Sequence, residues 1–269
     1  MSSVRHAFSV DVEDWYQGIE LPLEAWVGKE NRVDIGLSKV LEILSEKNVK
    51  ATFFTLGAVA RSNPKSIRII AKQGHEIASH TMFHEKIYDL EPTNFLKQER
   101  ECKAILEDTS ESKVEGFRAP YFSITNQSLW ALDILAELGY TYDSSISPMQ
   151  TWRYGIAGTE PGIYQLNSDL IEFTPSLGNF CSHPYGVGGA YLRIYPYKLT
   201  KATLKKSADS DLPGMFYVHP WELDPKHPRE KIGLKPFITH YARLGSTVPK
   251  LKKLLSDFQF TTVRQAIDL

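Results

Sequence analysis

Two histidines four residues apart, His80 and His84, are the first residues of this sequence whose types and spacing suggest chemistry. On a helical turn, positions i and i+4 lie on the same face, so both imidazoles could reach one cation. Neutral imidazole is a common ligand of zinc and of similar divalent metals. The pair therefore predicts a metal site, although the spacing also occurs by chance and needs support from the rest of the chain.

Three carboxylates, Asp11, Glu13 and Asp14, follow a β-type segment of alternating apolar and polar residues at 7–12. They would lie at the C-terminal end of a strand, which is the end where parallel α/β architectures bind ligands. Two histidines and one carboxylate would leave an open coordination position, as catalytic metal sites do. A second carboxylate could then take a proton from water as a general base.

Arg118 and His219 stand at the ends of two further β-type segments, 116–121 and 215–218. The C-terminal ends of parallel strands converge on one face of a barrel, so these side chains should join the carboxylates and the histidine pair. His219 could protonate a leaving group as a general acid. The combined set suits metal-assisted hydrolysis of an amide or an ester.

The elements that must position these residues alternate between strand and helix. This order predicts a parallel sheet with right-handed crossovers, either open or closed into a barrel. Residues 148–212 are rich in glycine and proline, and we interpret them as a loop and hairpin insertion within a single domain spanning 1–269. The remaining predicted strands are 51–56, 76–79, 140–145 and 260–263, and the predicted helices are 33–44, 64–72, 92–106, 128–138, 235–244 and 247–257.

The net charge of −1, without a basic block, argues against nucleic acid or an anionic membrane as the main partner. The first residues have no apolar core followed by a small-residue cleavage site, so we expect no secretory signal and a cytoplasmic protein. No run of about 18 apolar residues is present, which predicts no transmembrane segment.

Taken in order, these motifs resemble those of the polysaccharide deacetylase family, the NodB-homology group or carbohydrate esterase family 4. The resemblance spans roughly residues 7–225. Ser9–Trp15 and His219–Glu222 further resemble a subgroup found with bacterial exopolysaccharide and surface-glycan clusters. The matching motifs are Asp11-x-x-Asp14, His80-Thr-x-x-His84, Arg118-Ala-Pro120-Tyr121 and Tyr217-Val-His219.

The resemblance implies a distorted (β/α) barrel of seven or eight strands that carries a divalent metal, usually zinc. It implies hydrolysis of the N-acetyl group of an amino sugar, here in O-antigen, capsule or exopolysaccharide biosynthesis. The resemblance implies that Asp11 is the base, that Arg118 holds this base in place and that His219 is the acid. The backbone N–H of Tyr121 would bind the oxyanion. Asp14, His80 and His84 would be the three metal ligands.

The first motif departs from the family, because two residues separate Asp11 from Asp14 where the family has adjacent aspartates. Glu13 is therefore a rival of Asp14 for the metal. Trp221 could form an apolar wall for the acetyl methyl or the sugar, or could belong to the core. The family's fourth motif, an aspartate and a tryptophan beside the acid, is unclear, with Asp143 and Trp152 as candidates.

Two alternatives to the deacetylase hypothesis follow. One keeps the metal but changes the amide to a formyl-amide or a cyclic ureide. The other is a catalytically silent glycan-binding barrel on the same scaffold. Metal content together with turnover of N-acetylated sugars would separate them.

Overall fold

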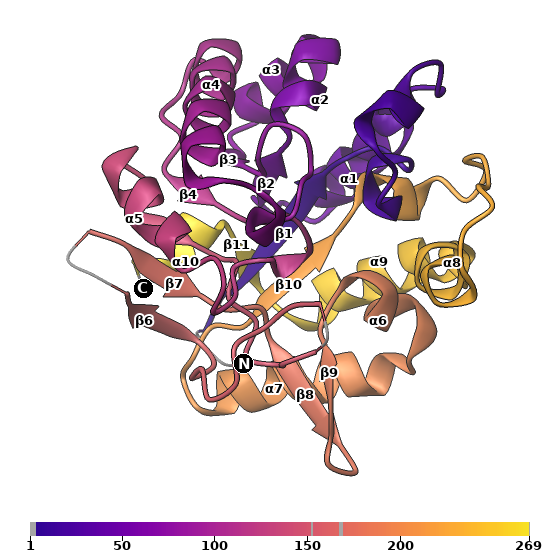
Figure 1. Ribbon diagram of the computed structural model, residues 1–269. Helices are drawn as coiled ribbons and strands as arrows, with labels where there is room; N and C mark the ends of the chain where they lie inside the picture. The colour runs from indigo at the N-terminus through magenta and orange to yellow at the C-terminus, as the bar shows by residue number, and fades with distance from the viewer. Residues whose placement is uncertain (1–3, 152, 167–168, 269) are drawn as a thin grey trace.

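The computed structural model describes residues 4–151, 153–166 and 169–268. Within these residues, nine strands form one curled sheet in the order β10-β1-β2-β3-β4-β5-β7-β6, with β11 also paired to β1 (Figure 1). All pairings are parallel except that of β6 with β7. These strands are β1 His6–Val12, β2 Thr52–Thr55, β3 Glu76–Ser79, β4 Gly116–Phe117, β5 Tyr142–Asp143, β6 Ile163–Gln165, β7 Ile171–Phe173, β10 Met215–Val218 and β11 Phe260–Thr261.

The sheet is the centre of the core, and β1 pairs with three other strands, β2, β10 and β11. Every residue of β1 is buried, as expected for a parallel strand covered on both faces. Phe8, Val10 and Val12 point into the main apolar cluster, together with Phe53 and Phe216 of the neighbouring strands. The packing of β1 on both faces therefore fixes the position of the residues that follow it.

Helices cover the outer face of the curled sheet (Figure 1). Between β1 and β5, one or two helices separate each strand from the next, which is the crossover pattern of a parallel α/β fold. The helices are α1 Val33–Glu46, α2 Gly57–Ser62, α3 Pro64–Lys72, α4 Pro92–Ser110, α5 Trp130–Glu137, α6 Gly189–Ile194, α7 Tyr197–Asp209, α8 Leu234–Tyr241, α9 Thr247–Asp257 and α10 Val263–Ile267.

The prediction of an α/β fold based on a curled, barrel-like parallel sheet is confirmed. The interpretation of 148–212 as loops and hairpins is only partly right. β6 and β7 extend the main sheet, and β8 Leu177–Phe180 forms a separate hairpin with β9 His183–Gly186 (Figure 1). The end of this region folds into α6 and α7, which the glycine and proline content had argued against.

In the described ranges, no helix has both the length and the apolar character needed to cross a bilayer.

Candidate active site

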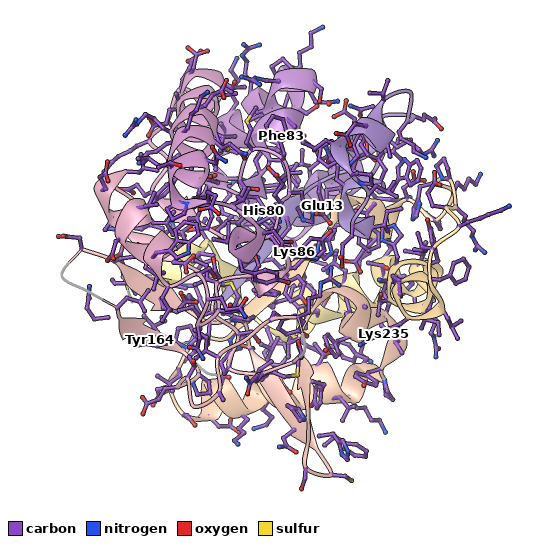
Figure 2. All side chains as sticks on the ribbon, in the orientation of Figure 1. Glu13, His80, Phe83, Lys86, Tyr164 and Lys235 are labelled. Atoms are coloured by element: carbon purple, nitrogen blue, oxygen red, sulfur yellow. The ribbon has the colours of Figure 1, made fainter. Side chains whose placement is uncertain are left out.

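The ends of four strands bring the predicted site residues together. Glu13 follows β1, His80 follows β3, Arg118 follows β4 and His219 follows β10. Figure 2 shows Glu13 and His80 close to each other in the middle of the view. The convergence expected at the C-terminal edge of a parallel sheet is therefore present.

Glu13, His80 and His84 form a buried cluster whose possible ligand atoms all lie within 4.8 Å of one another. The Nε2 atom of His84 is 2.5 Å from Oε2 of Glu13. The two histidines do not lie on a helical turn, as the spacing had suggested. Residues 80–86 form a loop, in which Thr81 and His84 have positive φ angles of 71° and 58°. This left-handed backbone turns both rings toward Glu13.

Of the two rival carboxylates, Glu13 and not Asp14 is the one that lies beside His80 and His84 in the structure. One carboxylate oxygen of Asp14 accepts hydrogen bonds from the backbone N–H groups of Arg32 and Val33, at 2.7 and 3.1 Å. The other accepts from the N–H of Trp15 at 2.7 Å. Asp14 thus caps the exposed N–H groups at the start of α1, where a carboxylate also interacts favourably with the helix dipole.

The cluster fits a divalent metal of the zinc type. Nδ1 of His80 lies 2.7 Å from the carbonyl oxygen of Arg118, and since a carbonyl only accepts, Nδ1 carries the proton and Nε2 keeps its lone pair. Burial lowers the pKa of His80 to about 4, so the ring is neutral near pH 7. Oε2 of Glu13 is buried and faces Nε2 of His84, and it has no hydrogen bond of regular geometry among the described residues. Two imidazoles and one carboxylate are ligands that zinc accepts in catalytic sites.

Asp11 and Arg118 form a buried ion pair beside this cluster. Nη1 of Arg118 donates to Oδ1 of Asp11 at 2.6 Å and to Oγ of Ser9 at 2.8 Å. The other nitrogens of the guanidinium donate to the carbonyl and hydroxyl oxygens of Ser144, and its plane lies over the ring of Phe54. The position of Asp11 is therefore fixed by a group that cannot give up its charge.

His219 reaches the cluster from the opposite side. Its Nε2 atom lies 3.9 Å from Oδ2 of Asp11 and 3.8 Å from Oε1 of Glu13. Its Nδ1 atom is 2.7 Å from Oε1 of Glu222. Burial alone would lower the pKa of His219, but the bond to Glu222 and the charge of Glu13 raise it to about 9. His219 therefore holds a proton at neutral pH, as a general acid must.

Glu222 and Arg193 are site residues that the sequence analysis did not include in the site. Nε of Arg193 donates to Oε2 of Glu222 at 2.5 Å, and both side chains are fully buried. Burial would raise the pKa of Glu222, but the charges of Arg193 and His219 lower it below its ordinary value. The position of Glu222 three residues after His219 was the available signal, because that spacing places both side chains on one turn.

Tyr121 and Trp221 flank the cluster in different ways. The ring of Tyr121 lies edge-on to His84 at 4.6 Å, on a left-handed turn with φ 57°. Trp221 is 6% exposed, and its two faces stack on His219 and His240. This burial favours the second of the two alternatives for Trp221, packing within a buried cluster.

Of the two fourth-motif candidates, only Asp143 can be placed, and its partners do not include His219. Asp143 lies beside Ser145 and Glu172, where burial raises its pKa to about 6. Trp152 lies outside the described residues. Glu222 and Trp221 are the acidic and indole side chains next to His219.

The fold is thus a curled, barrel-like parallel sheet, and three possible metal ligands lie near the C-terminal ends of its strands. The family model described as polysaccharide deacetylase matches residues 34–142, and a domain of unknown function, DUF3473, matches residues 144–268. Residues 34–142 therefore match a polysaccharide deacetylase domain. That match includes His80, His84, Arg118 and Tyr121.

Among curated proteins, the chitooligosaccharide deacetylase of Sinorhizobium fredii is 38% identical over 98 residues, which are 36% of this chain and 43% of that protein. The peptidoglycan-N-acetylglucosamine deacetylase of Bacillus cereus is 29% identical over 130 residues, 44% of this chain and 47% of that protein. The chain thus spans less than half the length of these relatives. The crystal structure of an assigned polysaccharide deacetylase from Mycobacterium smegmatis has a TM-score of 0.71 and 20% identity, covering 99% of this chain and 90% of that one.

Proposed function

We propose that this chain is a metal-dependent hydrolase that removes an N-acetyl group from an amino sugar of a glycan. One observation carries the proposal. Oδ2 of Asp11 and Nε2 of His219 lie 3.9 Å apart beside the cluster of Glu13, His80 and His84. Asp11 is held by an arginine, and His219 is held by a carboxylate. The deacetylases named among the relatives support the same reaction class.

Glu13, His80 and His84 would hold the metal, and zinc is the ion that we propose. When bound, it would polarise the amide carbonyl and make water a better nucleophile. The side chains that supply these ligands are buried, so bulk water is largely excluded from the reacting bond.

Asp11 accepts the proton of the attacking water while the new carbon–oxygen bond forms. His219 then donates its proton to the amide nitrogen as the carbon–nitrogen bond breaks, which gives acetate and a free amine. Arg118 keeps Asp11 in place, and Glu222 keeps the protonated ring of His219 turned toward the nitrogen. The backbone N–H of Tyr121 is proposed to stabilise the negative charge on the carbonyl oxygen.

The sugar is proposed to belong to a bacterial surface glycan such as O-antigen, capsule or exopolysaccharide. The support is the similarity of Ser9–Trp15 and His219–Glu222 to the subgroup associated with such glycans. An intracellular biosynthetic form of the glycan, linked to a lipid or a nucleotide, is the form that we propose as substrate.

The test is release of acetate and free amine from N-acetylated chitooligosaccharides by the purified protein, with zinc added or removed by a chelator. We expect turnover that requires the metal. Asp11→Asn should lower the rate by roughly 100-fold or more while metal content is kept, the usual scale of general-base loss. Asp133→Asn, the same change at an exposed position of α5, serves as the control.

Other outcomes would replace the proposal. Turnover of a formyl-amide or a cyclic ureide, without turnover of N-acetyl sugars, would assign the site to a different amide. Glycan binding without hydrolysis of any of these amides, by a protein that holds its metal, would indicate a silent barrel.

A further inference from the structure

We propose that Trp221 is a positioning residue for the metal-binding carboxylate, and that it connects this carboxylate to the imidazole of His219. The inference rests on the metal site of the proposed function. Nε1 of Trp221 donates a hydrogen bond to Oε1 of Glu13 at 2.9 Å, and both groups are buried. Oε1 is thus occupied, and Oε2 is the oxygen that faces His84.

The indole cannot turn away from Glu13, because both of its faces are covered. His240 stacks on one face with ring centres 3.9 Å apart, and His219 stacks on the other at 5.1 Å. The planes are inclined by only 21° and 16°. Movement of the indole would therefore disturb both the carboxylate and the ring of His219.

The side chain of Arg193 fixes the backbone that carries His240, which stacks on Trp221. Three bonds from the guanidinium of Arg193 reach the carbonyl oxygens of Thr239, His240 and Ala242 at the end of α8. These bonds anchor the helix end that carries His240. The same guanidinium binds Glu222, and Glu222 in turn binds His219. One buried cation thus supports both His240 and His219, the two rings that stack on the indole.

Gly18 leaves the space in which this hydrogen bond forms. A Cβ atom at this position would lie 2.8 Å from Oε1 of Glu13 and 3.0 Å from Nε1 of Trp221. Contacts this short would push apart the donor and the acceptor. Glycine is therefore required here by close approach and not by backbone conformation.

A partner that orients a metal-ligating side chain typically contributes ten- to hundredfold to metal affinity. Loss of the indole N–H should let the carboxylate of Glu13 rotate, and should weaken metal binding even if the fold is intact. The effect should also change the ligand geometry around the ion, which a general loss of packing would not do.

The experiment measures the zinc dissociation constant by competition with a chromophoric chelator, together with the visible spectrum of the cobalt-substituted protein. Trp221→Phe keeps a ring between the histidines and removes the donor. We expect its dissociation constant to rise about ten- to hundredfold, with an altered cobalt spectrum. Trp15→Phe is the matched control, since Trp15 is a buried indole of the same small cluster whose Nε1 donates to the carbonyl of Glu30.

Gly18→Ala provides a second approach that keeps Trp221, and it should weaken zinc binding in the same direction. Unchanged affinity and spectrum in both Trp221→Phe and Gly18→Ala would overturn the proposal, as would equal losses in Trp221→Phe and Trp15→Phe. None of these measurements uses a substrate, so absence of deacetylation would leave this result valid and would count only against the proposed function.

Discussion

At the scale of single residues, Glu13 and Asp14 show how neighbouring carboxylates acquire different roles. The side chain of Glu13 faces the two histidines, whereas that of Asp14 faces the start of α1. Burial raises the pKa of Asp14 to about 6, although three backbone N–H groups and Arg32 favour its charged form. The direction of each side chain, and not acidity alone, decides which of the two carboxylates faces the histidines and which caps α1.

Glu13→Gln and Asp14→Asn should therefore affect different properties, metal content in the first variant and stability in the second. Glu13→Gln should lose most of the bound metal, because an amide is a poorer ligand than a carboxylate. Asp14→Asn should keep the metal and lower the free energy of unfolding by about 1–3 kcal/mol, because its NH2 group replaces one of the two oxygens that accept from backbone N–H groups. Elemental analysis and urea denaturation of both variants provide the measurements. Loss of metal in Asp14→Asn alone would restore Asp14 as the ligand.

A second prediction at this scale concerns His219. An amine leaving group needs a proton, whereas an activated ester with a good leaving group needs much less help. His219→Ala and His219→Gln should abolish hydrolysis of an N-acetyl sugar and should spare much of any activity on an aryl acetate. Metal content should stay near that of the parent. Similar losses on both substrates would mean that His219 binds the oxyanion or the metal, and that another group is the acid.

The sequence was sufficient to predict that Asp11, Arg118 and the two histidines converge, because each follows a strand and parallel strands end at one edge. It was insufficient to choose between Glu13 and Asp14. That choice depends on where α1 begins, 19 positions after Asp14, and on whether its N–H groups need an acceptor. Periodicity and motifs contain no information about such a contact.

At the scale of elements, α4 carries a buried carboxylate directly behind β3. Oε1 of Glu99 accepts hydrogen bonds from the hydroxyls of Ser79 and Tyr140. Burial raises the pKa of Glu99 to about 7 from an ordinary value of 4.5. The residue before His80 is thus held by a carboxyl group that is largely protonated below pH 7.

This arrangement predicts that the free energy of unfolding falls as pH rises from about 5 to 7. The unfolded carboxyl releases its proton first, so the folded state binds more protons in this window, at a slope of up to about 1.4 kcal/mol per pH unit. Glu99→Gln should remove this component. Urea denaturation of the metal-free protein at several pH values measures it, and Glu101→Gln on the same helix, at a half-exposed position, is the control. Parallel pH profiles of Glu99→Gln and the parent would contradict the prediction.

Among the elements that the sequence analysis missed are α6 and α7. Gly188, Gly189 and Pro196 lie at their starts, and residues of these types normally indicate turns. A Cβ at Gly188 or Gly189 would collide with Tyr217 of β10, so these glycines allow α6 to approach the sheet closely. Their role is a tertiary contact, which local composition does not reveal.

At the scale of the whole molecule, the cluster of Glu13, His80 and His84 connects the segments after β1 and β3, so a metal ion bound there should stabilise the entire fold. At a free metal concentration 100 times the dissociation constant, the gain is about 2.7 kcal/mol. Thermal unfolding with zinc or a chelator should therefore differ by several degrees in midpoint. His84→Ala should show no such difference, and a zinc-dependent shift retained in that variant would contradict the cluster as the binding site.

The pairing of β1 with β10 also determines when the sheet can be completed during synthesis. Val10 pairs with Val218, so one long edge of the first strand has no partner until the chain beyond β10 has left the ribosome. At the usual rate of about 5–20 residues per second, this delay is on the order of ten seconds or longer. Throughout that time, an apolar strand with unpaired N–H and C=O groups is available to other nascent chains. Aggregation during expression should therefore depend on translation speed and on chaperones, and much less on the stability of the finished protein.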